Sequence, residues 1–171
     1  MERAAIALGS NLGDRLLFIQ TAAGHIGQDV LTNARLSTVY ETPPWGITDQ
    51  PRFLNAVIVG ETDWKAPAIL NYLKDLEREM GRRHSQVNGP REIDLDLIAL
   101  GSAIERTPAI EVPHPRCYDR AFVVKPLCDV WPEWRHPIFG LTARERLASL
   151  NTAGVVAFVS GSSFSSAPVP K

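Results

Sequence analysis

Two aspartates, Asp94 and Asp96, lie two positions apart in a short run of alternating polarity and could bind a metal ion. The apolar residues Ile93, Leu95 and Leu97 alternate with them, and side chains of a β-strand point to opposite faces in turn. Both carboxylates should therefore share one face, with Cα atoms about 7 Å apart. Such neighbours repel each other when partly buried, unless a cation binds them or one takes up a proton. Oxygen ligands that leave most of the coordination shell to water and phosphate are typical of Mg²⁺.

Two arginines stand just before this pair. Arg82 and Arg91 flank a polar loop that ends in Gly89-Pro90, and a planar guanidinium can bind two phosphate oxygens at once. An isolated Asp-x-Asp is more often a solvated strand face. The paired arginines and the glycine–proline turn favour a magnesium and phosphate site instead.

A second group of residues suits a flat heterocycle. Phe53 and Asn55 should share one face of another strand, where the ring can stack and the amide can donate and accept. The rigid loop Thr42-Pro43-Pro44-Trp45-Gly46 lies just upstream and could close such a pocket with Trp45. Taken alone, Phe53 is explained as a core residue, and the loop as a surface turn.

Further charged residues could contact a nucleotide. Lys74 and Glu77 lie one turn apart on an expected helix, although such a pair is usually an exposed ion pair. His114, Arg116 and Arg120 form a second cationic cluster ahead of Phe122, although a solvated face would look the same.

Composition narrows the class of protein. The 171 residues carry a net charge of −1, so no overall field favours nucleic acid or an anionic membrane. Cys117 and Cys128 lack partners at zinc spacing and form no disulfide framework, which favours the reduced cytoplasm. We expect neither a signal peptide nor a membrane span. Glycine-rich nucleotide loops and a Ser/His/Asp arrangement are missing from the sequence.

Periodicity predicts an α+β domain over residues 1–160 with a Ser- and Pro-rich tail, 161–171. Strands are expected at 4–8, 35–41 and 53–61 and in the aspartate run up to Leu100, and 104–112 should pair back. Helices are expected from Asp14, from Pro67 to Gly81, and from Thr142 to Leu150. Residues 155–159 also look structured. Several loops are too short for parallel crossovers, so we expect a mixed or mostly antiparallel sheet covered by helices.

Taken together, the motifs resemble the family of 6-hydroxymethyl-7,8-dihydropterin pyrophosphokinases of folate biosynthesis. The resemblance spans about residues 4–128, and the matching segments stand in the family's order. They are Ala7-Leu8-Gly9-Ser10-Asn11-Leu12-Gly13-Asp14, Tyr40-Glu41-Thr42-Pro43-Pro44-Trp45-Gly46, Phe53-Leu54-Asn55-Ala56, Leu76-Glu77-Arg78-Glu79-Met80-Gly81-Arg82, the run from Gly89 to Leu97, and Val112-Pro113-His114-Pro115-Arg116.

The resemblance implies a three-layer α-β-α, ferredoxin-like domain that moves the pyrophosphoryl group of ATP to the pterin's hydroxymethyl oxygen and releases AMP. It implies two Mg²⁺ ions on Asp94 and Asp96, and these aspartates with Arg82 and Arg91 as the catalytic set. The implied ATP site comprises Lys74, Glu77, Arg82, Arg91, the backbone of Leu97, His114, Arg116 and Arg120. The implied pterin site comprises Thr42, Pro43, Pro44, Trp45, Phe53, Asn55 and Phe122.

The sequence also departs from the family pattern as the resemblance gives it. His84 stands where a second arginine is usual, Val87-Asn88 replaces an Arg-Trp pair, and the loop is one residue shorter. Lys74 stands in place of a common glutamine, and Phe53 in place of a frequent tyrosine. These changes bear on ATP affinity and loop closure. A metal-dependent nucleotidyltransferase and a non-catalytic pterin-binding paralogue remain alternatives, and we expect a monomer.

Overall fold

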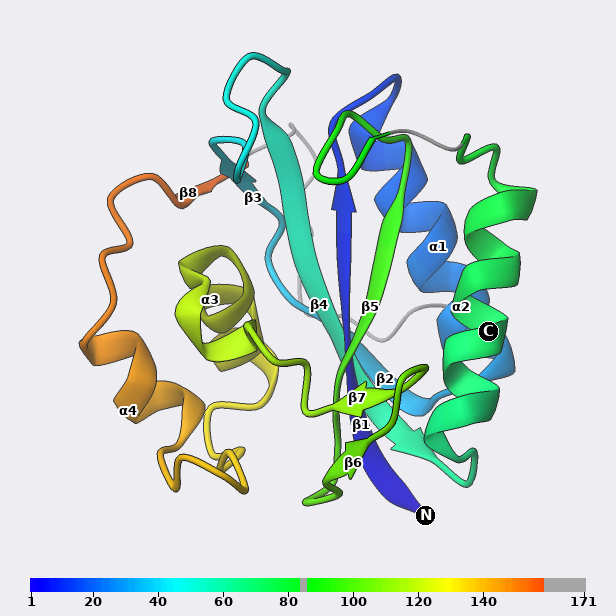
Figure 1. Ribbon diagram of the computed structural model, residues 1–171, viewed down its shortest axis with the longest axis vertical. Coiled ribbons are helices and arrows are strands. Elements are labelled where there is room, and N and C mark those ends of the chain that lie inside the picture. The colour runs from blue at the N-terminus through cyan, green and yellow to red at the C-terminus, as the bar shows by residue number, and fades with distance from the viewer. Residues whose placement is uncertain (84–85, 159–171) are drawn as a thin grey trace.

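The computed structural model describes residues 1–83 and 86–158. The sheet that carries the expected site is built from strands in the order β5-β1-β4-β3-β8, with β2 also paired to β4 (Figure 1). Every strand pair in the described part of the chain is antiparallel. The strands are β1 (Glu2–Ser10), β2 (Thr32–Leu36), β3 (Tyr40–Thr42), β4 (Phe53–Thr62), β5 (Asp94–Leu100) and β8 (Val156–Ala157).

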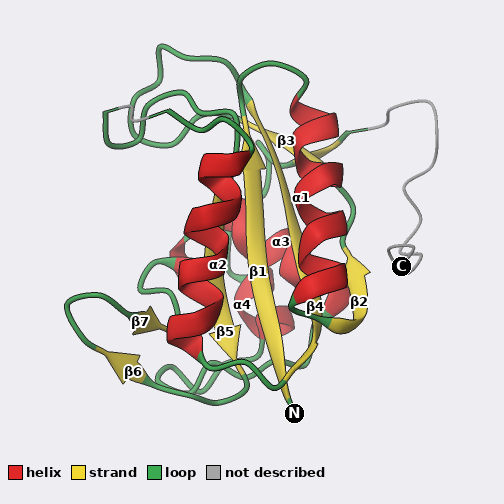
Figure 2. Cartoon of the chain, turned by 90° about the vertical axis from the view of Figure 1, so that its right-hand side faces the viewer, coloured by secondary structure: helices red, strands yellow, loops and turns green. Residues whose placement is uncertain are grey.

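Helices cover both faces of this sheet. Figure 2 shows α1 (Arg15–Asp29) and α2 (Ala66–Glu79) side by side in front of β1 and β4. The helices α3 (Ala121–Val130) and α4 (Ala143–Ala148) lie on the opposite face. The α+β expectation and its three-layer α-β-α, ferredoxin-like form are thereby confirmed.

The two faces of the central strand β1 differ in side-chain size. Ile6 and Leu8 point into the core beneath α1 and α2 and are at most 1 % exposed. Ala5, Ala7 and Gly9 alternate with them and point toward α3. Small side chains on that face leave a space between the sheet and α3, at the end of β1 where Gly9 lies.

The expected strand at 35–41 is interrupted. Its two halves are β2 and β3, and the chain between them bonds to β4 through a side chain. The Ser37 N–H donates to the Val57 carbonyl at 2.9 Å, and Ser37 Oγ accepts from the Val57 N–H at 2.9 Å. A hydroxyl thus replaces a backbone group of the ladder, which alternation cannot reveal.

The helix α3 was not expected from the sequence. Its buried residues Val123, Val124, Leu127 and Val130 have helical spacing, but Pro126 lies inside the helix and argues against one. Burial of this face against β4 outweighs the lost hydrogen bond. Residues 104–112 were expected to pair back, but they pair within themselves, as a separate small hairpin of β6 (Glu105–Arg106) and β7 (Glu111–Val112).

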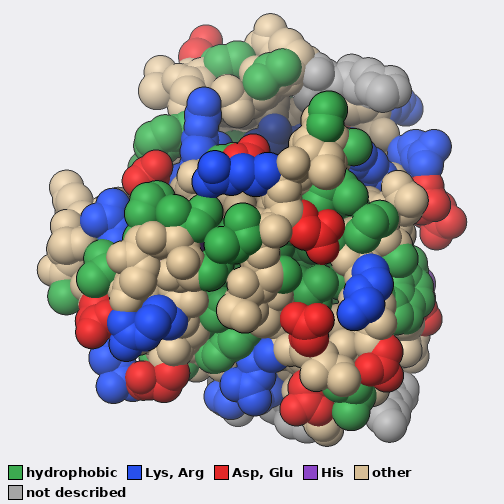
Figure 3. Space-filling model, turned by 60° about the horizontal axis from the view of Figure 1, so that its bottom comes forward, with side chains coloured by type: hydrophobic (Ala, Val, Ile, Leu, Met, Phe, Trp, Pro, Cys, Tyr) green, Lys and Arg blue, Asp and Glu red, His purple; other side chains and the backbone are tan. Residues whose placement is uncertain are grey.

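In the described part of the chain, no helix is long and apolar enough to cross a membrane. On the face shown in Figure 3, basic and acidic side chains are interspersed among hydrophobic ones rather than separated by sign. The expected tail 161–171 lies outside the described residues, as do His84 and Val159.

Candidate active site

A cavity of about 220 Å³ opens between the ends of β1, β4 and β5 and the helix α3. It brings together most of the residues that the sequence singles out, from segments far apart in the chain. Those that line it are Thr42, Pro43, Trp45, Phe53, Asn55, Arg91, Asp94, Asp96, His114, Arg120 and Phe122.

Gly9 forms the floor of this first cavity. In the sheet it lies opposite Asn55 on β4 and Asp94 on β5. A Cβ atom at this position would lie 2.9 Å from Asn55 Oδ1 and 3.8 Å from the Phe53 ring. Only glycine therefore leaves the amide, the ring and the carboxylate on one open surface. The sequence motif contains Gly9, and the alternation of small residues could have assigned it this role.

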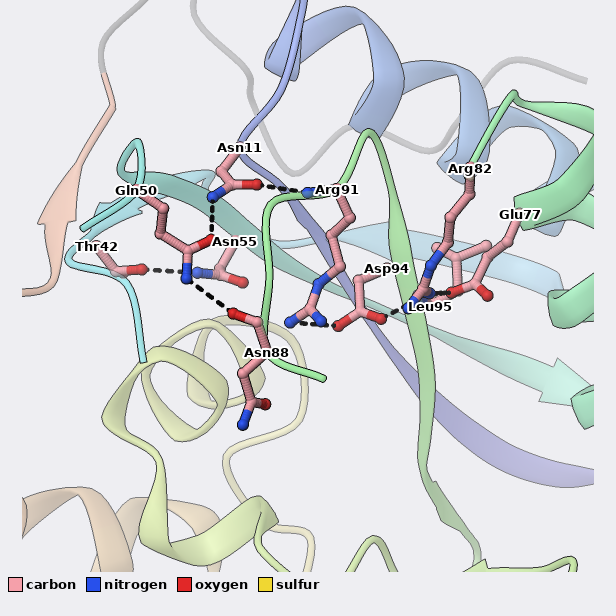
Figure 4. Close-up of polar contacts among 10 residues, drawn as sticks. All are labelled: Asn11, Thr42, Gln50, Asn55, Glu77, Arg82, Asn88, Arg91, Asp94 and Leu95. Carbon is pink, nitrogen blue, oxygen red and sulfur yellow. Dashed lines mark hydrogen bonds and ion pairs between the residues drawn. The ribbon is translucent and has the colours of Figure 1, made fainter. Parts of the chain in front are cut away.

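One edge of the cavity is a fixed polar pair. Asn55 Nδ2 donates to Thr42 Oγ1 at 2.7 Å, and Thr42 is only 1 % exposed (Figure 4). The pairing of β3 with β4 places Thr42 opposite Phe53. The amide therefore has a fixed orientation beside the ring, as recognition of a polar heterocycle edge requires.

Asp94 is held by two arginines. Arg82 Nη1 donates to Asp94 Oδ1 at 2.8 Å, and Arg91 Nη2 lies 3.3 Å from Asp94 Oδ2 (Figure 4). Arg82 also pairs with Glu77 of α2, whose Oε1 accepts the Leu95 N–H at 2.7 Å. Burial raises the pKa of Glu77, against the lowering effect of the Leu95 N–H and Arg82. Glu77 thus ties α2 to β5 between the two aspartates.

Asp96 has a different environment from Asp94. Burial, with the nearby carboxylates of Asp94 and Glu77, raises the pKa of Asp96 to about 7. A divalent cation would relieve this repulsion, and the donors are the hard oxygens that Mg²⁺ prefers, so the residues fit that ion. Among the described residues, no group of three or more His, Cys, Asp or Glu could hold a metal. The two carboxylates would therefore share the ion with substrate oxygens.

A second, larger cavity of about 680 Å³ adjoins the first. Lys74, Arg78, Arg82 and Arg83 give it a mostly cationic lining, which suits a polyanion. Asn88 and Arg91 line both cavities, so they form the wall between the two.

Side-chain amides tie together three loops around this wall. Asn11, after β1, donates through Nδ2 to Gln50 Oε1 at 3.0 Å and accepts the Arg91 N–H at 2.8 Å. Gln50, in the loop before β4, donates to the Asn88 carbonyl at 2.8 Å (Figure 4). Sequence reasoning missed Gln50 and gave Asn11 no role, because contacts between distant loops leave no periodic signal.

Two aromatic rings and an arginine lie at the mouth of the first cavity. The rings of Trp45 and Phe122 are 6.3 Å apart, and the Arg120 guanidinium lies 5.8 Å from the first and 5.6 Å from the second. Burial lowers the pKa of Arg120, while the Asp96 carboxylate opposes that shift. The Arg120 Nε is buried without a hydrogen-bond partner among the described residues. An anion would satisfy it.

The expected charge of His114 needs correction. Burial, and then the nearby Arg120, lowers the pKa of His114 to about 4. The imidazole is therefore neutral near pH 7, and its Nδ1 accepts the Arg116 N–H at 3.2 Å. The positive charge of this cluster comes from the two arginines alone.

The family model of 7,8-dihydro-6-hydroxymethylpterin-pyrophosphokinase, HPPK, matches residues 5–132. The chain belongs to this family. The match covers α1, α2, α3, the strands β2 to β7 and β1 from residue 5 onward, and it includes all residues that line the two cavities.

Two bacterial relatives match this chain along most of their own length. A 2-amino-4-hydroxy-6-hydroxymethyldihydropteridine pyrophosphokinase of Aquifex aeolicus is 37% identical over 140 residues, 82% of this chain and 87% of the relative. One of Methylorubrum extorquens is 37% identical over 157 residues, 91% of this chain and 98% of the relative.

Other relatives are much longer. A folate synthesis bifunctional protein of Arabidopsis thaliana is 42% identical over 130 residues, 75% of this chain but 27% of that protein. A solved structure of HPPK-DHPS in complex with substrates superposes with a TM-score of 0.70 at 14% identity. The superposition covers 86% of this chain and 43% of the HPPK-DHPS chain, and it shows that the two share a fold.

Within this HPPK chain, some expected site residues lie away from the first cavity. Lys74 and Glu77 line the second cavity, with Arg82. The Leu97 side chain is buried in the core beneath α1 and α2, so only its backbone is available to a ligand. Pro44 and the exposed Arg116 are not among the residues that line either cavity. His84 lies outside the described residues.

Proposed function

We propose that this chain transfers the pyrophosphoryl group of ATP to the hydroxymethyl oxygen of 6-hydroxymethyl-7,8-dihydropterin and releases AMP, in the synthesis of tetrahydrofolate. Family membership supports the reaction. The observation that carries the proposal is that two different cavities share a wall. The smaller one is lined by aromatic rings and an amide, and the larger one has a mostly cationic lining. Arg91 is part of that wall and pairs with Asp94 of the first cavity, so a flat acceptor and a triphosphate would meet there.

The first cavity holds the pterin in this proposal. Phe53 and Phe122 take its two faces, Asn55 reads its edge, and the loop of Thr42, Pro43, Pro44 and Trp45 closes over it. Stacking and a fixed amide fit a flat ring with polar edges. In this proposal the pterin is oriented with its hydroxymethyl group toward Asp94 and Asp96.

The second cavity holds the nucleotide. Lys74 and Glu77 line it together with Arg82 and Arg91, which would bind the phosphates. We also assign nucleotide contacts to the Leu97 backbone, to Arg116, and to His114 and Arg120 of the first cavity. The hydroxymethyl oxygen attacks the β-phosphorus, the bond from that phosphorus to the oxygen bridging to the α-phosphate breaks, and AMP leaves with that oxygen. Such a reaction needs alignment and charge neutralisation more than a strong base.

Asp94 and Asp96 would hold two Mg²⁺ ions, which neutralise phosphate charge and polarise the reacting oxygens when bound. Arg82 and Arg91, which now neutralise Asp94, would turn toward phosphate. Asp94 is thereby released to bind a cation.

One assay separates this proposal from its two rivals. The chain is incubated with ATP, Mg²⁺ and 6-hydroxymethyl-7,8-dihydropterin, and the nucleotide products are separated. A pyrophosphokinase gives AMP and pterin diphosphate in equal amounts. A nucleotidyltransferase would give free pyrophosphate, and a non-catalytic pterin-binding paralogue would give neither.

We also infer that the protein acts as a monomer in the cytoplasm. All the residues that we assign to the pterin, the nucleotide and the metal ions belong to one copy of the chain. Sedimentation at working concentration tests the monomer, and a mass of twice 18.8 kDa would contradict it.

A further inference from the structure

We propose that the guanidinium of Arg91 competes with the pterin for the face of Phe53, and that nucleotide phosphates in the second cavity remove this competition. Arg91 is then the residue through which binding of the nucleotide raises the affinity for the pterin. The inference rests on the proposed function, because it takes the pterin as the ligand of the first cavity.

The contact between Arg91 and Phe53 is the first observation. The Arg91 guanidinium carbon lies 5.4 Å from the centre of the Phe53 ring, within the range of a cation–π interaction. With Arg91 in this position, Phe53 is 7 % exposed, so little of its ring is open. A planar cation and a planar heterocycle cannot occupy the same ring face together.

The second observation is that the Arg91 side chain is loosely held. Its ion pair with Asp94 measures 3.3 Å, longer than the 2.8 Å contact from Arg82 to the same carboxylate. The Arg91 Nε is buried and has no hydrogen-bond partner among the described residues. The side chain can leave at modest cost, because its departure breaks one long ion pair and no hydrogen bond of Nε.

The backbone of Arg91, in contrast, is fixed. Its N–H donates to Asn11 Oδ1 at 2.8 Å, and its carbonyl accepts the Asn11 N–H at 3.1 Å. A rotation of the side chain therefore suffices, without movement of the loop. Figure 4 shows this side chain extending from the Asn11 contact to a position between Asn55 and Asp94.

The direction of the movement follows from the wall between the cavities. Arg91 lines both of them, so phosphate groups in the second cavity lie within reach of its guanidinium. A planar guanidinium forms paired hydrogen bonds with phosphate, which are stronger than its single long ion pair here. Binding of the nucleotide should therefore uncover Phe53 and raise the affinity for the pterin.

The test measures pterin affinity by calorimetric titration of the full chain. Each protein is titrated with 6-hydroxymethyl-7,8-dihydropterin, first alone and then with saturating Mg²⁺ and a non-hydrolysable α,β-methylene analogue of ATP. In the wild type, the analogue should raise pterin affinity. In Arg91→Ala, pterin affinity without nucleotide should rise about threefold to thirtyfold, the range of a cation–π contact, and the analogue should add little.

Two further variants make the result specific. Arg91→Lys keeps a cation beside Asp94 but lacks the planar group, so it should also raise pterin affinity, to a smaller degree. If Arg91→Ala fails to fold, Arg91→Lys still tests the inference. Arg82→Ala is the matched control, because Arg82 pairs with Asp94 but is not a partner of the Phe53 ring. It should not raise pterin affinity without nucleotide.

The inference is overturned if neither Arg91 variant binds pterin more tightly than the wild type without nucleotide. An equal gain in Arg82→Ala would also overturn it, since the charge of Asp94 would then be the cause. If no protein binds pterin even with the analogue, the proposed function itself is wrong, which is a separate result.

Discussion

The two aspartates that define the site have unequal roles as single residues. Asp94 is paired with two arginines, whereas Asp96 is half-buried and repelled by the carboxylates around it. Two guanidinium groups thus already lie against Asp94, while Asp96 needs either a proton or a metal ion. The sequence predicted that both carboxylates share a face, and the structure places both in one cavity.

Substitution of either aspartate should remove nearly all turnover. Asp94→Ala and Asp96→Ala each lose a metal ligand that acts mainly in the transition state, so the barrier should rise by several kcal/mol. The measurement is kcat at saturating Mg²⁺, with thermal unfolding to show that the fold survives. Glu111→Ala, on the exposed strand β7, is a matched control and should keep normal turnover. Near-normal activity in Asp94→Ala or Asp96→Ala would refute the two-metal proposal.

Phe53 should matter for the pterin and not for the nucleotide. Phe53→Ala removes a stacking surface and should weaken pterin binding, measured with the nucleotide analogue present, by about 1–3 kcal/mol. The affinity for ATP should stay within about twofold, since Phe53 lines only the first cavity. Equal losses for both ligands would show instead that Phe53 is simply a core residue.

His136 should make stability depend on pH. It is 3 % exposed, and burial lowers its pKa, while its Nδ1 accepts the N–H groups of Ile138 and Phe139 at 3.2 and 3.3 Å. Below the ordinary value of 6.5, the unfolded chain binds a proton that the folded protein resists, so the free energy of unfolding falls as pH falls. His136→Asn keeps an acceptor but cannot titrate. Urea unfolding at several pH values below neutrality should give a shallower slope for this variant, and equal slopes would contradict the assignment.

At the scale of elements, three loops that carry the site are joined by Asn11 and Gln50. These amides fix the loop after β1, the loop before β4 and the segment before β5 relative to one another. The cavities are thus formed by loops whose positions depend on a few side-chain contacts.

Loss of Gln50 should loosen both cavities together. Gln50→Ala removes the partner of Asn11 and the donor to the Asn88 carbonyl, at a cost of about 1–3 kcal/mol for groups left unpaired. We expect KM to rise for ATP and for the pterin, with a smaller change in kcat. Gln28→Ala, on the exposed side of α1, is the control. If Gln50→Ala lowers the melting temperature but leaves both KM values unchanged, the amide has only a structural role.

Regular elements could be predicted from sequence where one periodicity dominates. The strand β5 begins with alternating polarity, β1 and β4 are apolar runs, and α1 and α2 carry apolar stripes, so all five were expected. Pro126 concealed α3, and the Ser37 hydroxyl divided an expected strand in two. The loop network could not be predicted, because amides that bond to distant backbone groups follow no spacing. The site residues came from motif resemblance as much as from pattern.

At the scale of the whole molecule, one sheet separates two apolar cores. Ile69 of α2 belongs to one core and Leu127 of α3 to the other, and both are fully buried. The strands β1 and β4 contribute side chains to both cores. Neither core can therefore persist without the sheet, and the single domain over residues 1–160 stays a prediction.

Both cores should unfold in one transition. Ile69→Ala and Leu127→Ala should each lower the free energy of unfolding by about 2–5 kcal/mol, the usual cost of such a cavity. Far-UV and near-UV circular dichroism should give coincident urea curves in the wild type and both variants. A variant that loses near-UV signal well before far-UV signal would show that its core unfolds independently.

The position of Trp45 gives the molecule a built-in optical reporter. Of the four tryptophans, all in the described part of the chain, Trp45 alone lines the first cavity, whereas Trp64 contacts Tyr72 and Trp131 lies beside Trp134. It is 48 % exposed, with Arg120 over its ring. A ligand that enters the cavity must change the polarity around this indole and displace the water that it meets. Its emission should therefore follow occupancy in real time, without any attached dye, and Trp45→Phe would leave the signal of the other three as a constant background.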